Sequence, residues 1–515
     1  MYRSIYMLCI HISHKKSNYS VLKIGAITMD HVQGFDRNQE ILFPAKIDDY
    51  IEEENLVRFI EAFVALLDLT LLGFTHAEVK TTGRPSYNPA DLLKLYIYGY
   101  LNTIRSSRKL EKETHRNVEV MWLLKKLTPD HKTIADFRKN NTGPIKKVFK
   151  EFVLFCKELD LYGRETVGID GSKFKAVNSK KRNFNEDKLI KKLKDIEEKI
   201  EVYLKELDEN DKNESSVKQP DAKEVKEKIK QLEDRKSEYK ELLKKLEETG
   251  EKQVSTTDPD SRMMMNNQKF DVCYNVQTTI DDKNNLIVDY EVTNDVNDKK
   301  QLNEMAGKAK EILGVESLDV FTDKGYYNPD EIKKCVDNNT IPYIPEPKPK
   351  QPKEDSIPKA GFCDCDFKYD ASKDVYACPE GRELTFSVMS EKNNKMMKEY
   401  RSDSCSSCES KSKCTRNKNG RVIFRWEHEE ILDDMRKRVK ENKDVVKKRN
   451  CMCEHPFGTI KRGFNQGYLL LKGLRKVGGE MGFTMLAYNM RRVINILGVN
   501  KLIESLNTGK VLSQI

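Results

Sequence analysis

The chain has 515 residues, of which 38% are hydrophobic and 34% are charged. This length predicts more than one domain, and the hydrophobic fraction is sufficient to build real cores. The 92 basic and 83 acidic residues leave a formal net charge of +9, which fits a nucleic-acid partner and equally a lysine-rich composition. No apolar run approaches the roughly 20 residues needed to cross a bilayer, which argues against a membrane partner and predicts a cytoplasmic location.

The N-terminal third of the chain is predicted to be helical. Residues 1–28 are expected to be a disordered leader, since they lack a convincing signal-peptide cleavage pattern. Residues 29–160 follow, with Asn88 as a plausible helix N-cap before a proline at the first helical position. Short helices with basic faces at 107–127 and 133–139 are typical of a helix-turn-helix-like DNA-binding domain, with a plain helical bundle as the alternative.

Residues 161–345 are predicted to form an α/β unit. Four short apolar strands are expected, at 166–171, 272–280, 286–292 and 318–321. A helix at 298–313 is expected between the last two of them. A further short strand is expected at 342–344. This order indicates a mixed sheet flanked by helices.

A helical hairpin is predicted to interrupt this unit at residues 186–250. Leucine, isoleucine and other apolar residues recur at steps of three and four on both sides of a polar loop at 208–221. Such stretches predict an antiparallel hairpin or short coiled coil. We expect it to be a scaffold or an interaction arm, and not the site itself.

Three acidic residues are candidates for metal binding. Asp170 and Asp323 each end an apolar strand, where a rigid sheet can hold both at one edge. Carboxylates are the ligands that Mg²⁺ prefers, and phosphodiester chemistry commonly uses two ions about 3.5–4 Å apart. Each aspartate alone also fits an ordinary turn. Glu454 lies among basic residues and would share a helix face with Lys461, although a salt-bridged surface helix has the same pattern.

Several ordered motifs between about residues 36 and 500 carry a family resemblance. They are Gly83-Arg84-Pro85, Pro129-Asp130-His131, Ile169-Asp170-Gly171-Ser172, Thr322-Asp323-Lys324-Gly325 and Glu454-His455-Pro456-Phe457-Gly458-Thr459-Ile460-Lys461. In this set the chain resembles the DDE transposases of bacterial insertion sequences, and specifically the IS eleven-eighty-two family. So many matches in one order are far more specific than any one of them.

The resemblance implies a fold and an activity. The fold is a ribonuclease-H-like mixed α/β sheet flanked by helices, in which Asp170, Asp323 and Glu454 are catalytic and hold two Mg²⁺ (or Mn²⁺) ions. The activity is cleavage of DNA at terminal inverted repeats and strand transfer to target DNA. Joining two ends calls for at least a dimer, so a homodimer is expected in the active complex. The alternatives are a metal-dependent nuclease of the same fold without strand transfer and a non-catalytic DNA-binding relic.

The resemblance also implies contacts to DNA. Lys461 matches the basic residue that relatives place seven positions after the glutamate. Relatives also carry a tyrosine and an arginine upstream of the glutamate, where this chain has Lys447 and Asn450, so Arg449 is a displaced candidate. The expected DNA contacts are Lys461, Arg462, Arg449, Arg108 and Arg138.

Residues 346–425 are expected to be a cysteine-rich insertion, before a helical second part of the core at 426–505. Four thiolates suit a structural Zn²⁺, and clustered cysteines without an export signal favour a metal over disulfides. Unliganded thiols are the alternative. The proposed ligands are Cys378, Cys405, Cys408 and Cys414, with Cys363 and Cys365 as competitors.

Four residues near the acidic motifs are given structural roles. Cys451 and Cys453 flank Glu454 and are expected to be packing residues. Asp258 and Asp260 also resemble a family motif and could supplement the metal site, but a loop turn is favoured for both.

Overall fold

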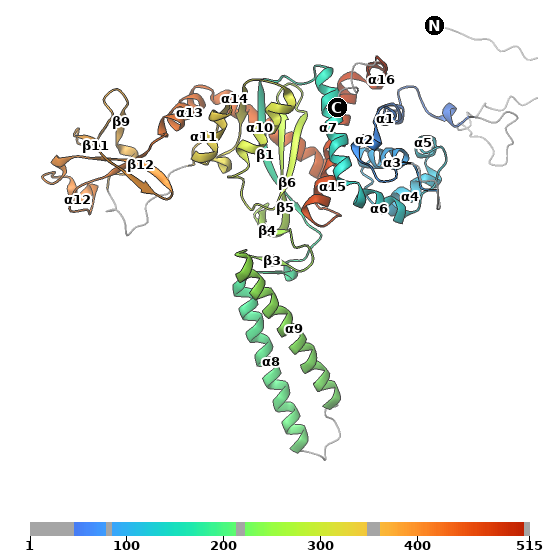
Figure 1. The fold of residues 1–515 in the computed structure, drawn as a ribbon, viewed down its shortest axis with the longest axis horizontal. Helices are drawn as coiled ribbons and strands as arrows, with labels where there is room; N and C mark the ends of the chain where they lie inside the picture. Colours follow the sequence, from blue (N-terminus) through green and yellow to red (C-terminus); the bar gives the residue numbers. More distant parts are fainter. Residues whose placement is uncertain (1–45, 79–84, 213–221, 348–360, 509–515) are drawn as a thin grey trace, which may run out of the picture. The chain divides into compact units, whose positions relative to one another are not determined.

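The computed structural model describes residues 46–78, 85–212, 222–347 and 361–508 (Figure 1). The predicted leader, 1–28, lies outside these residues. The chain divides into residues 1–49 and 50–515 by its internal contacts, and the architecture below is that of the second unit. Within the described ranges, no helix combines the length and apolar character needed to cross a bilayer.

The N-terminal region is helical, as predicted. After a short turn, η1 (Ile47–Tyr50), its helices are α1 (Leu56–Ala65), α2 (Leu69–Leu72), α3 (Pro89–Leu101), α4 (Ser107–Arg116), α5 (Val118–Leu123), α6 (His131–Asn140) and α7 (Thr142–Glu158). Asn88 caps α3 by accepting a hydrogen bond from the backbone N–H of Ala90. The predicted single helix at 107–127 is two helices, because Asn117 caps a new one, α5.

The central sheet has six strands: β1 (Thr166–Lys175), β4 (Arg262–Asn266), β5 (Lys269–Asp281), β6 (Ile287–Thr293), β7 (Leu318–Phe321) and β8 (Thr340–Tyr343). β5 pairs antiparallel with β1, β4 and β6, whereas β7 runs parallel to both β1 and β8. The strand order is therefore β6-β5-β1-β7-β8, and β4 pairs with the first residues of β5. Helices α10 (Leu302–Leu313) and α11 (Pro329–Asp337) and the turn η3 (Lys324–Tyr326) connect the later strands.

The strand that carries Asp170 is longer than predicted. We expected it to end at Asp170-Gly171, but β1 continues to Lys175 and pairs with β5 as far as Cys273. Gly171 is therefore not a turn glycine. A Cβ atom there would lie 2.3 Å from Nε2 of Gln277 and 2.8 Å from Oδ1 of Asp298, so the glycine makes room for two neighbouring side chains.

The hairpin insertion consists of α8 (Glu186–Lys212) and α9 (Ala222–Thr249), which lie side by side in Figure 1. A two-stranded ribbon, β2 (Asn183–Phe184) with β3 (Val254–Ser255), closes its base. Phe184, Leu189, Leu246 and Val254 form a small core there. This small core packs the base of the hairpin together, and short connections link that base to the central sheet.

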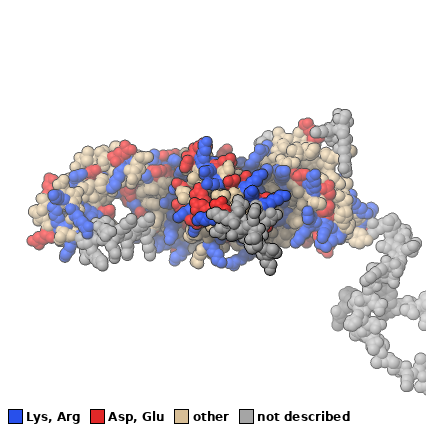
Figure 2. All heavy atoms as spheres, turned by 90° about the horizontal axis from the view of Figure 1, so that it is seen from below, with Lys and Arg blue, Asp and Glu red and all other residues tan. Residues whose placement is uncertain are grey.

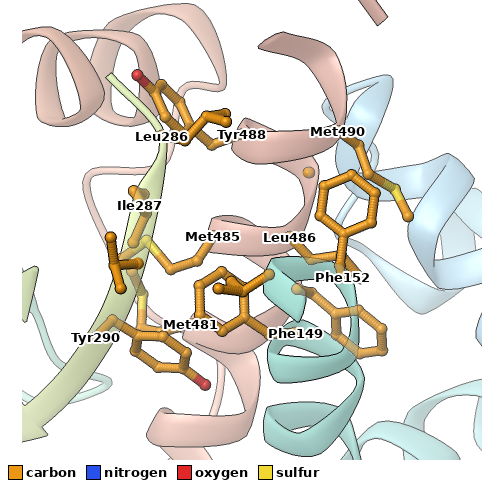
Figure 3. Close-up of a cluster of buried hydrophobic side chains, with 14 of the residues drawn as sticks. Phe149, Phe152, Leu286, Ile287, Tyr290, Met481, Met485, Leu486, Tyr488 and Met490 are labelled. Carbon is orange, nitrogen blue, oxygen red and sulfur yellow. The ribbon is translucent and has the colours of Figure 1, made fainter. Parts of the chain in front are cut away.

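One long helix, α15 (Leu474–Leu497), lies between the sheet and α7 (Figure 3). Met481 and Met485 of α15 and Phe149 and Phe152 of α7 are buried, and each such side chain contributes about 1.5–3 kcal/mol. Gly479 allows the close crossing, since a Cβ there would lie 2.5 Å from Cα of Thr142. A last helix, α16 (Val499–Asn507), packs on α1.

The cysteine-rich segment folds as a separate five-stranded antiparallel sheet, which the sequence patterns did not predict. Its elements are η4 (Asp364–Asp366), β9 (Lys368–Asp370), β10 (Val375–Ala377), β11 (Glu383–Lys392), β12 (Lys395–Arg401), η5 (Asp403–Cys405), α12 (Lys411–Cys414) and β13 (Ile423–Trp426). It has its own core of Phe367, Tyr376, Leu384, Tyr400 and Ile423. Helices α13 (Glu429–Glu441) and α14 (Lys443–Gly458) and the π-helical turn η6 (Thr459–Gly463) then lead back to α15.

Candidate active site

The register of β1 and β7 places Asp170 beside Asp323. Gly168 pairs with Phe321 in the last pair between these parallel strands. Asp170 and Asp323 each follow that pair by two residues, and the backbone is extended at both. Because side chains alternate along extended chains and neighbouring strands lie about 4.8 Å apart, the two carboxylates project from the same side of adjacent strands.

The charges around Asp170 support this placement. Burial raises the pKa of Asp170 to about 6, the positive charge of Arg449 opposes this increase, and the negative charges of Asp323 and Asp298 add to it. A half-buried carboxylate with a second carboxylate beside it is poorly solvated. Such a pair is suited to a bound cation.

Helix α14 brings Glu454 to the same strand. A Cβ atom at Gly168 would lie 2.4 Å from Cε of Met452 and 2.5 Å from Sγ of Cys453, so the helix packs directly on β1. Cys453 is buried, and burial raises the pKa of its thiol, with further increases from Asp170, Asp323 and Glu454. The charges of all three acidic residues therefore act on one buried thiol.

The three carboxylates do not form one tight cluster. Among the described residues, the only trio of His, Cys, Asp or Glu side chains with ligand atoms all within 4.8 Å of one another is Cys363, Cys365 and Asp366. Glu454 is exposed, whereas Asp170 and Asp323 are partly buried. Asp170 lies in the sheet and Asp323 directly follows β7, whereas Glu454 lies on an exposed part of α14.

Arg449 is a cation whose charge acts on Asp170. Its charge lowers the pKa of both Asp170 and the Cys453 thiol. Lys447 is exposed, and its ammonium lies 3.9 Å from Asp444. The side chain of Asn450 lies outside the described part of the structure.

Lys461 is attached to β1 just past Asp170. Its Nζ donates to Oγ of Ser172 at 2.7 Å and to the carbonyl oxygen of Lys173 at 2.9 Å. Burial lowers its pKa, while the negative charge of Asp170 opposes this change. The ammonium is only partly exposed, next to the exposed side chain of Arg462.

Arg138 does not belong among the surface contacts. It is 6% exposed and its guanidinium donates to the carbonyl oxygen of Arg105 at 3.0 Å. It also lies over the ring of Tyr96. Because its guanidinium lies inside the fold, Arg138 is not among the DNA contacts that we propose. Arg108, at the start of α4, is exposed.

Asp258 and Asp260 hold the start of α15. Asp258 is fully buried and accepts hydrogen bonds from the Tyr274 hydroxyl at 2.7 Å and the Gly473 N–H at 3.1 Å. Asp260 accepts from the N–H of Leu474 at 2.9 Å. Both carboxylates bind the loop and helix terminus that follow η6.

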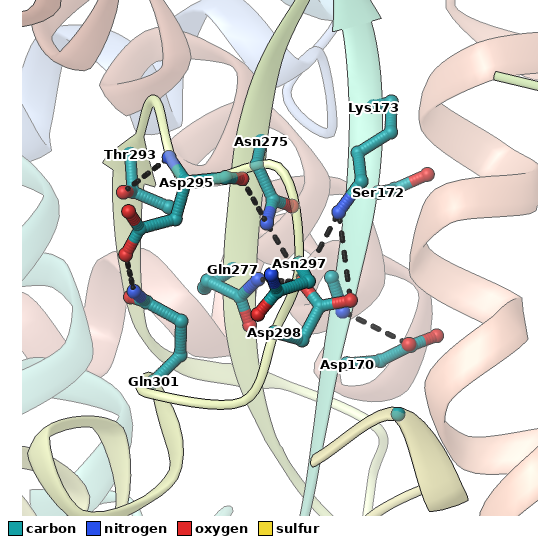
Figure 4. Close-up of polar contacts among 12 residues, drawn as sticks. Asp170, Ser172, Lys173, Asn275, Gln277, Thr293, Asp295, Asn297, Asp298 and Gln301 are labelled. Carbon is teal, nitrogen blue, oxygen red and sulfur yellow. Dashed lines mark hydrogen bonds and ion pairs between the residues drawn. The ribbon is translucent and has the colours of Figure 1, made fainter. Parts of the chain in front are cut away.

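A polar network on the other face of β1 was not predicted from the sequence (Figure 4). Oδ1 of Asp298 accepts hydrogen bonds from Asn275 and Gln277, both at 2.7 Å, and from Lys173 at 3.1 Å. Asn275 and Gln277 are fully buried in β5. Two amides within an otherwise apolar strand were the available signal, since buried amides need partners.

The four candidate zinc ligands line one small cavity of about 30 Å³. Burial raises the pKa of the Cys414 thiol, and Cys405, Cys378 and Cys408 add to this effect while Arg421 opposes it. Sγ of Cys378 accepts a hydrogen bond from the N–H of Arg382 at 3.3 Å. The competitors Cys363 and Cys365 form a disulfide with each other, contrary to the expectation of metal binding over disulfides.

The face of the molecule seen from below does not mark a path for DNA by its charge. On the face drawn in Figure 2, basic and acidic side chains are interspersed over the described residues. The modest net charge is therefore not concentrated on that face. The partner has to be inferred from the site and from sequence relationships.

Two family models match the chain. Residues 45–140 match a family described as "Transposase domain (DUF772)", and residues 377–494 match one described as "Transposase DDE domain". No curated protein and no solved structure matches it. The matches indicate a transposase, a class of proteins that bind DNA. More particularly, they indicate a DDE transposase, an enzyme class that uses divalent metal ions.

Proposed function

We propose that the chain is the transposase of a bacterial insertion sequence of the IS eleven-eighty-two family. It binds terminal inverted repeats, cleaves the DNA there and joins the freed end to target DNA, with Asp170, Asp323 and Glu454 holding two Mg²⁺ or Mn²⁺ ions. The observation that carries this proposal is the register that sets Asp170 beside Asp323 under the helix that bears Glu454.

The topology supports a ribonuclease-H-like core. Three antiparallel strands, β6, β5 and β1, are followed across the sheet by β7 and β8, which are parallel to β1. The first aspartate lies on β1, the second follows β7, and the glutamate lies on the later helix α14. This is the arrangement that the resemblance implies for such cores.

The proposed reaction has two phosphoryl transfers. In the first, water attacks a phosphodiester at the transposon end, which leaves a 3′-hydroxyl and a 5′-phosphate. In the second, that 3′-hydroxyl attacks a target phosphodiester and releases a target 3′-hydroxyl. Bound divalent ions would activate the attacking oxygen and stabilise the leaving oxygen. Asp170 and Asp323 would supply the two of the three proposed carboxylate ligands that the central sheet positions.

The neighbouring cations suit the DNA backbone. The charge of Arg449 acts on Asp170 and on the neighbouring Cys453 thiol, and Lys461 is attached to β1 just past Asp170. With Arg462 and Arg108, they are our proposed phosphate contacts. Joining two transposon ends requires at least a homodimer.

A structural Zn²⁺ bound by Cys378, Cys405, Cys408 and Cys414 is proposed for the small sheet. All four thiols face one cavity, and thiolate sulfur is a preferred zinc ligand. The cavity is lined both by the turn with Cys378 and by the loop with Cys405 and Cys408, and a metal bound there would link the two segments.

Alanine substitution tests the catalytic assignment. Asp170→Ala, Asp323→Ala and Glu454→Ala should each reduce Mg²⁺-dependent cleavage of inverted-repeat DNA by about 100-fold or more, since each removes a ligand of the reacting ions. Asp444→Ala is the matched control, because Asp444 is an exposed acid on the same helix, α14.

Retained cleavage by Glu454→Ala under Mg²⁺ would refute the assignment. A supercoiled target plasmid in the same reaction distinguishes the two enzymatic alternatives. Joined products indicate strand transfer, whereas cleavage without joined products indicates a nuclease.

A further inference from the structure

A chain of buried polar contacts lies on the face of the sheet opposite α14. Tyr326, Gln277 and Asn275 are each at most 1% exposed. Burying such groups costs free energy unless they are hydrogen-bonded, so each of them needs a partner inside the fold. Their contacts converge on one carboxylate, that of Asp298.

The contacts form one continuous relay. The Tyr326 hydroxyl donates to Oε1 of Gln277, and Nε2 of the same amide donates to Oδ1 of Asp298 at 2.7 Å. Lys173 donates to that oxygen at 3.1 Å and forms an ion pair with the carboxylate. Gly171 leaves the space that Gln277 and Asp298 occupy.

The ends of the relay lie beside the two aspartates. Lys173 follows Asp170 by three residues on β1, and Tyr326 follows Asp323 by three residues in η3. On the other face, Lys461 binds Ser172 and the carbonyl oxygen of Lys173. The strand after Asp170 is thus held from both sides, and one of these attachments leads to the turn after Asp323.

We propose that the relay Tyr326–Gln277–Asp298–Lys173 sets the separation of Asp170 and Asp323 for divalent-ion binding. Asp298 is a positioning residue and not an ion ligand, because Oδ1 already accepts three hydrogen bonds and Lys173 neutralises its charge. This inference rests on the proposed function of the two aspartates.

Two conservative substitutions test the relay, each with a matched control. Tyr326→Phe removes only the donating hydroxyl, and its control is Tyr327→Phe, whose hydroxyl contacts Glu346 instead. Asp298→Asn removes the charge that Lys173 faces. Its control is Asp295→Asn in the same loop, which accepts from Gln301.

Free Mn²⁺ is measured by electron paramagnetic resonance during titration of the full chain, below the unfolding temperature of each variant. We expect Tyr326→Phe and Asp298→Asn each to weaken Mn²⁺ binding about tenfold, as is typical when partners of metal ligands are removed. The two controls should bind as the wild type does. A purely structural role would lower the melting temperature and leave the Mn²⁺ dissociation constant of the folded protein unchanged.

Wild-type Mn²⁺ affinity in both relay variants would overturn this inference while leaving the proposed function intact. Mn²⁺ binding by the wild type that persists in Asp170→Ala and Asp323→Ala would instead contradict the proposed function, and the relay inference with it. If one relay variant does not fold, the other gives the same reading.

Discussion

Two glycines on β1 control what approaches Asp170. At Gly168 the missing side chain admits Met452 and Cys453 of α14, and at Gly171 it admits Gln277 and Asp298 from the other face. Side chains from other elements therefore pack closely against both faces of β1 within three residues of Asp170. A methyl group at either glycine would displace side chains on which the position of Asp170 depends.

Gly171→Ala should reduce cleavage by about tenfold and lower the free energy of unfolding by about 1–3 kcal/mol, the usual cost of overpacking. The added Cβ would meet Nε2 of Gln277 at 2.3 Å, and hydrogen bonds to Asp298 and Tyr326 prevent that amide from moving aside freely. Cleavage rates and urea unfolding measure the two effects. Gly307→Ala in α10 is the control, because nothing lies within 4 Å of its Cβ position. Equal behaviour of the two variants would contradict the steric argument.

The buried position of Asp170 predicts a pH-dependent stability of the metal-free protein. Its folded pKa is raised to about 6, whereas an unfolded aspartate has a pKa of about 3.9. The folded state therefore favours the protonated form, and its stability falls as pH rises from about 4 to about 6. The separation of the two pKa values corresponds to about 3 kcal/mol.

Asp170→Asn should remove this loss, so its stability relative to the wild type should increase between pH 4 and pH 7. Urea unfolding at several pH values in the presence of a chelator measures the difference. Asp444→Asn, at an exposed acid, should show no such trend. A constant difference between Asp170→Asn and the wild type across this range would show that Asp170 is solvated as an ordinary aspartate.

At the scale of elements, α14 and η6 attach to β1 in two ways. Met452 and Cys453 pack on Gly168, and Lys461 bonds to Ser172 and Lys173. His455 connects the same helix to α15: Nδ1 lies 2.9 Å from the Tyr488 hydroxyl, and Arg492 lies 3.3 Å from Nε2. Because arginine only donates, Nε2 is the acceptor and Nδ1 carries the proton. These contacts hold Glu454 next to the sheet.

Lys461→Met should weaken binding of inverted-repeat DNA and reduce the slope of log affinity against log salt by about one, as expected for a lost phosphate contact. Fluorescence anisotropy at several salt concentrations measures both quantities. Lys501→Met, at an exposed lysine of α16, is the control. A lowered melting temperature with unchanged DNA affinity would make Lys461 an anchor of the strand only.

At the scale of the whole chain, buried charged side chains connect the N-terminal helical region to α15. Glu480 of α15 is fully buried and accepts hydrogen bonds from the N–H groups of Leu470 and Leu471. Arg105 lies 3.6 Å from it, and Arg138 donates to the carbonyl oxygen of Arg105. Arg105 therefore joins the N-terminal helical region to the rest of the fold, and Arg138 holds the backbone at Arg105.

The small cysteine-rich sheet has a core of five buried side chains, which is little for a separate unit. We expect one zinc per chain by elemental analysis, and loss of that zinc in Cys405→Ser and Cys408→Ser with a lower melting temperature. Metal removal should expose the cavity thiols to alkylation. Cys451→Ser, at an exposed cysteine outside the cavity, should retain the zinc. Full-length protein purified without zinc, and as stable as after zinc addition, would contradict this prediction.

The sequence by itself determined the mixed α/β class, the helical N-terminal region and the order of the acidic motifs. Apolar periodicity records which faces are buried, and caps such as Asn88 act on neighbouring residues. The strand at 318–321 was predicted with the bounds that β7 has. The same local patterns correctly placed Asp323 just after a strand, whereas Asp170 was predicted to end its strand and lies inside β1, which continues to Lys175.

Only the tertiary structure decided what depends on residues distant in sequence. The local sequence pattern predicts that Gly171 ends a strand. Its actual role is to leave space for Gln277 and Asp298, which lie more than 100 residues later in the chain. Arg138 has the sequence environment of a surface cation and is buried because α3 and α15 cover it. The five-stranded sheet was missed because β9 and β10 have only three residues each, and the longer β11 is largely exposed, so little alternation marks these strands. Local sequence patterns indicate which residues are buried, whereas contacts between distant segments decide which residues cover them.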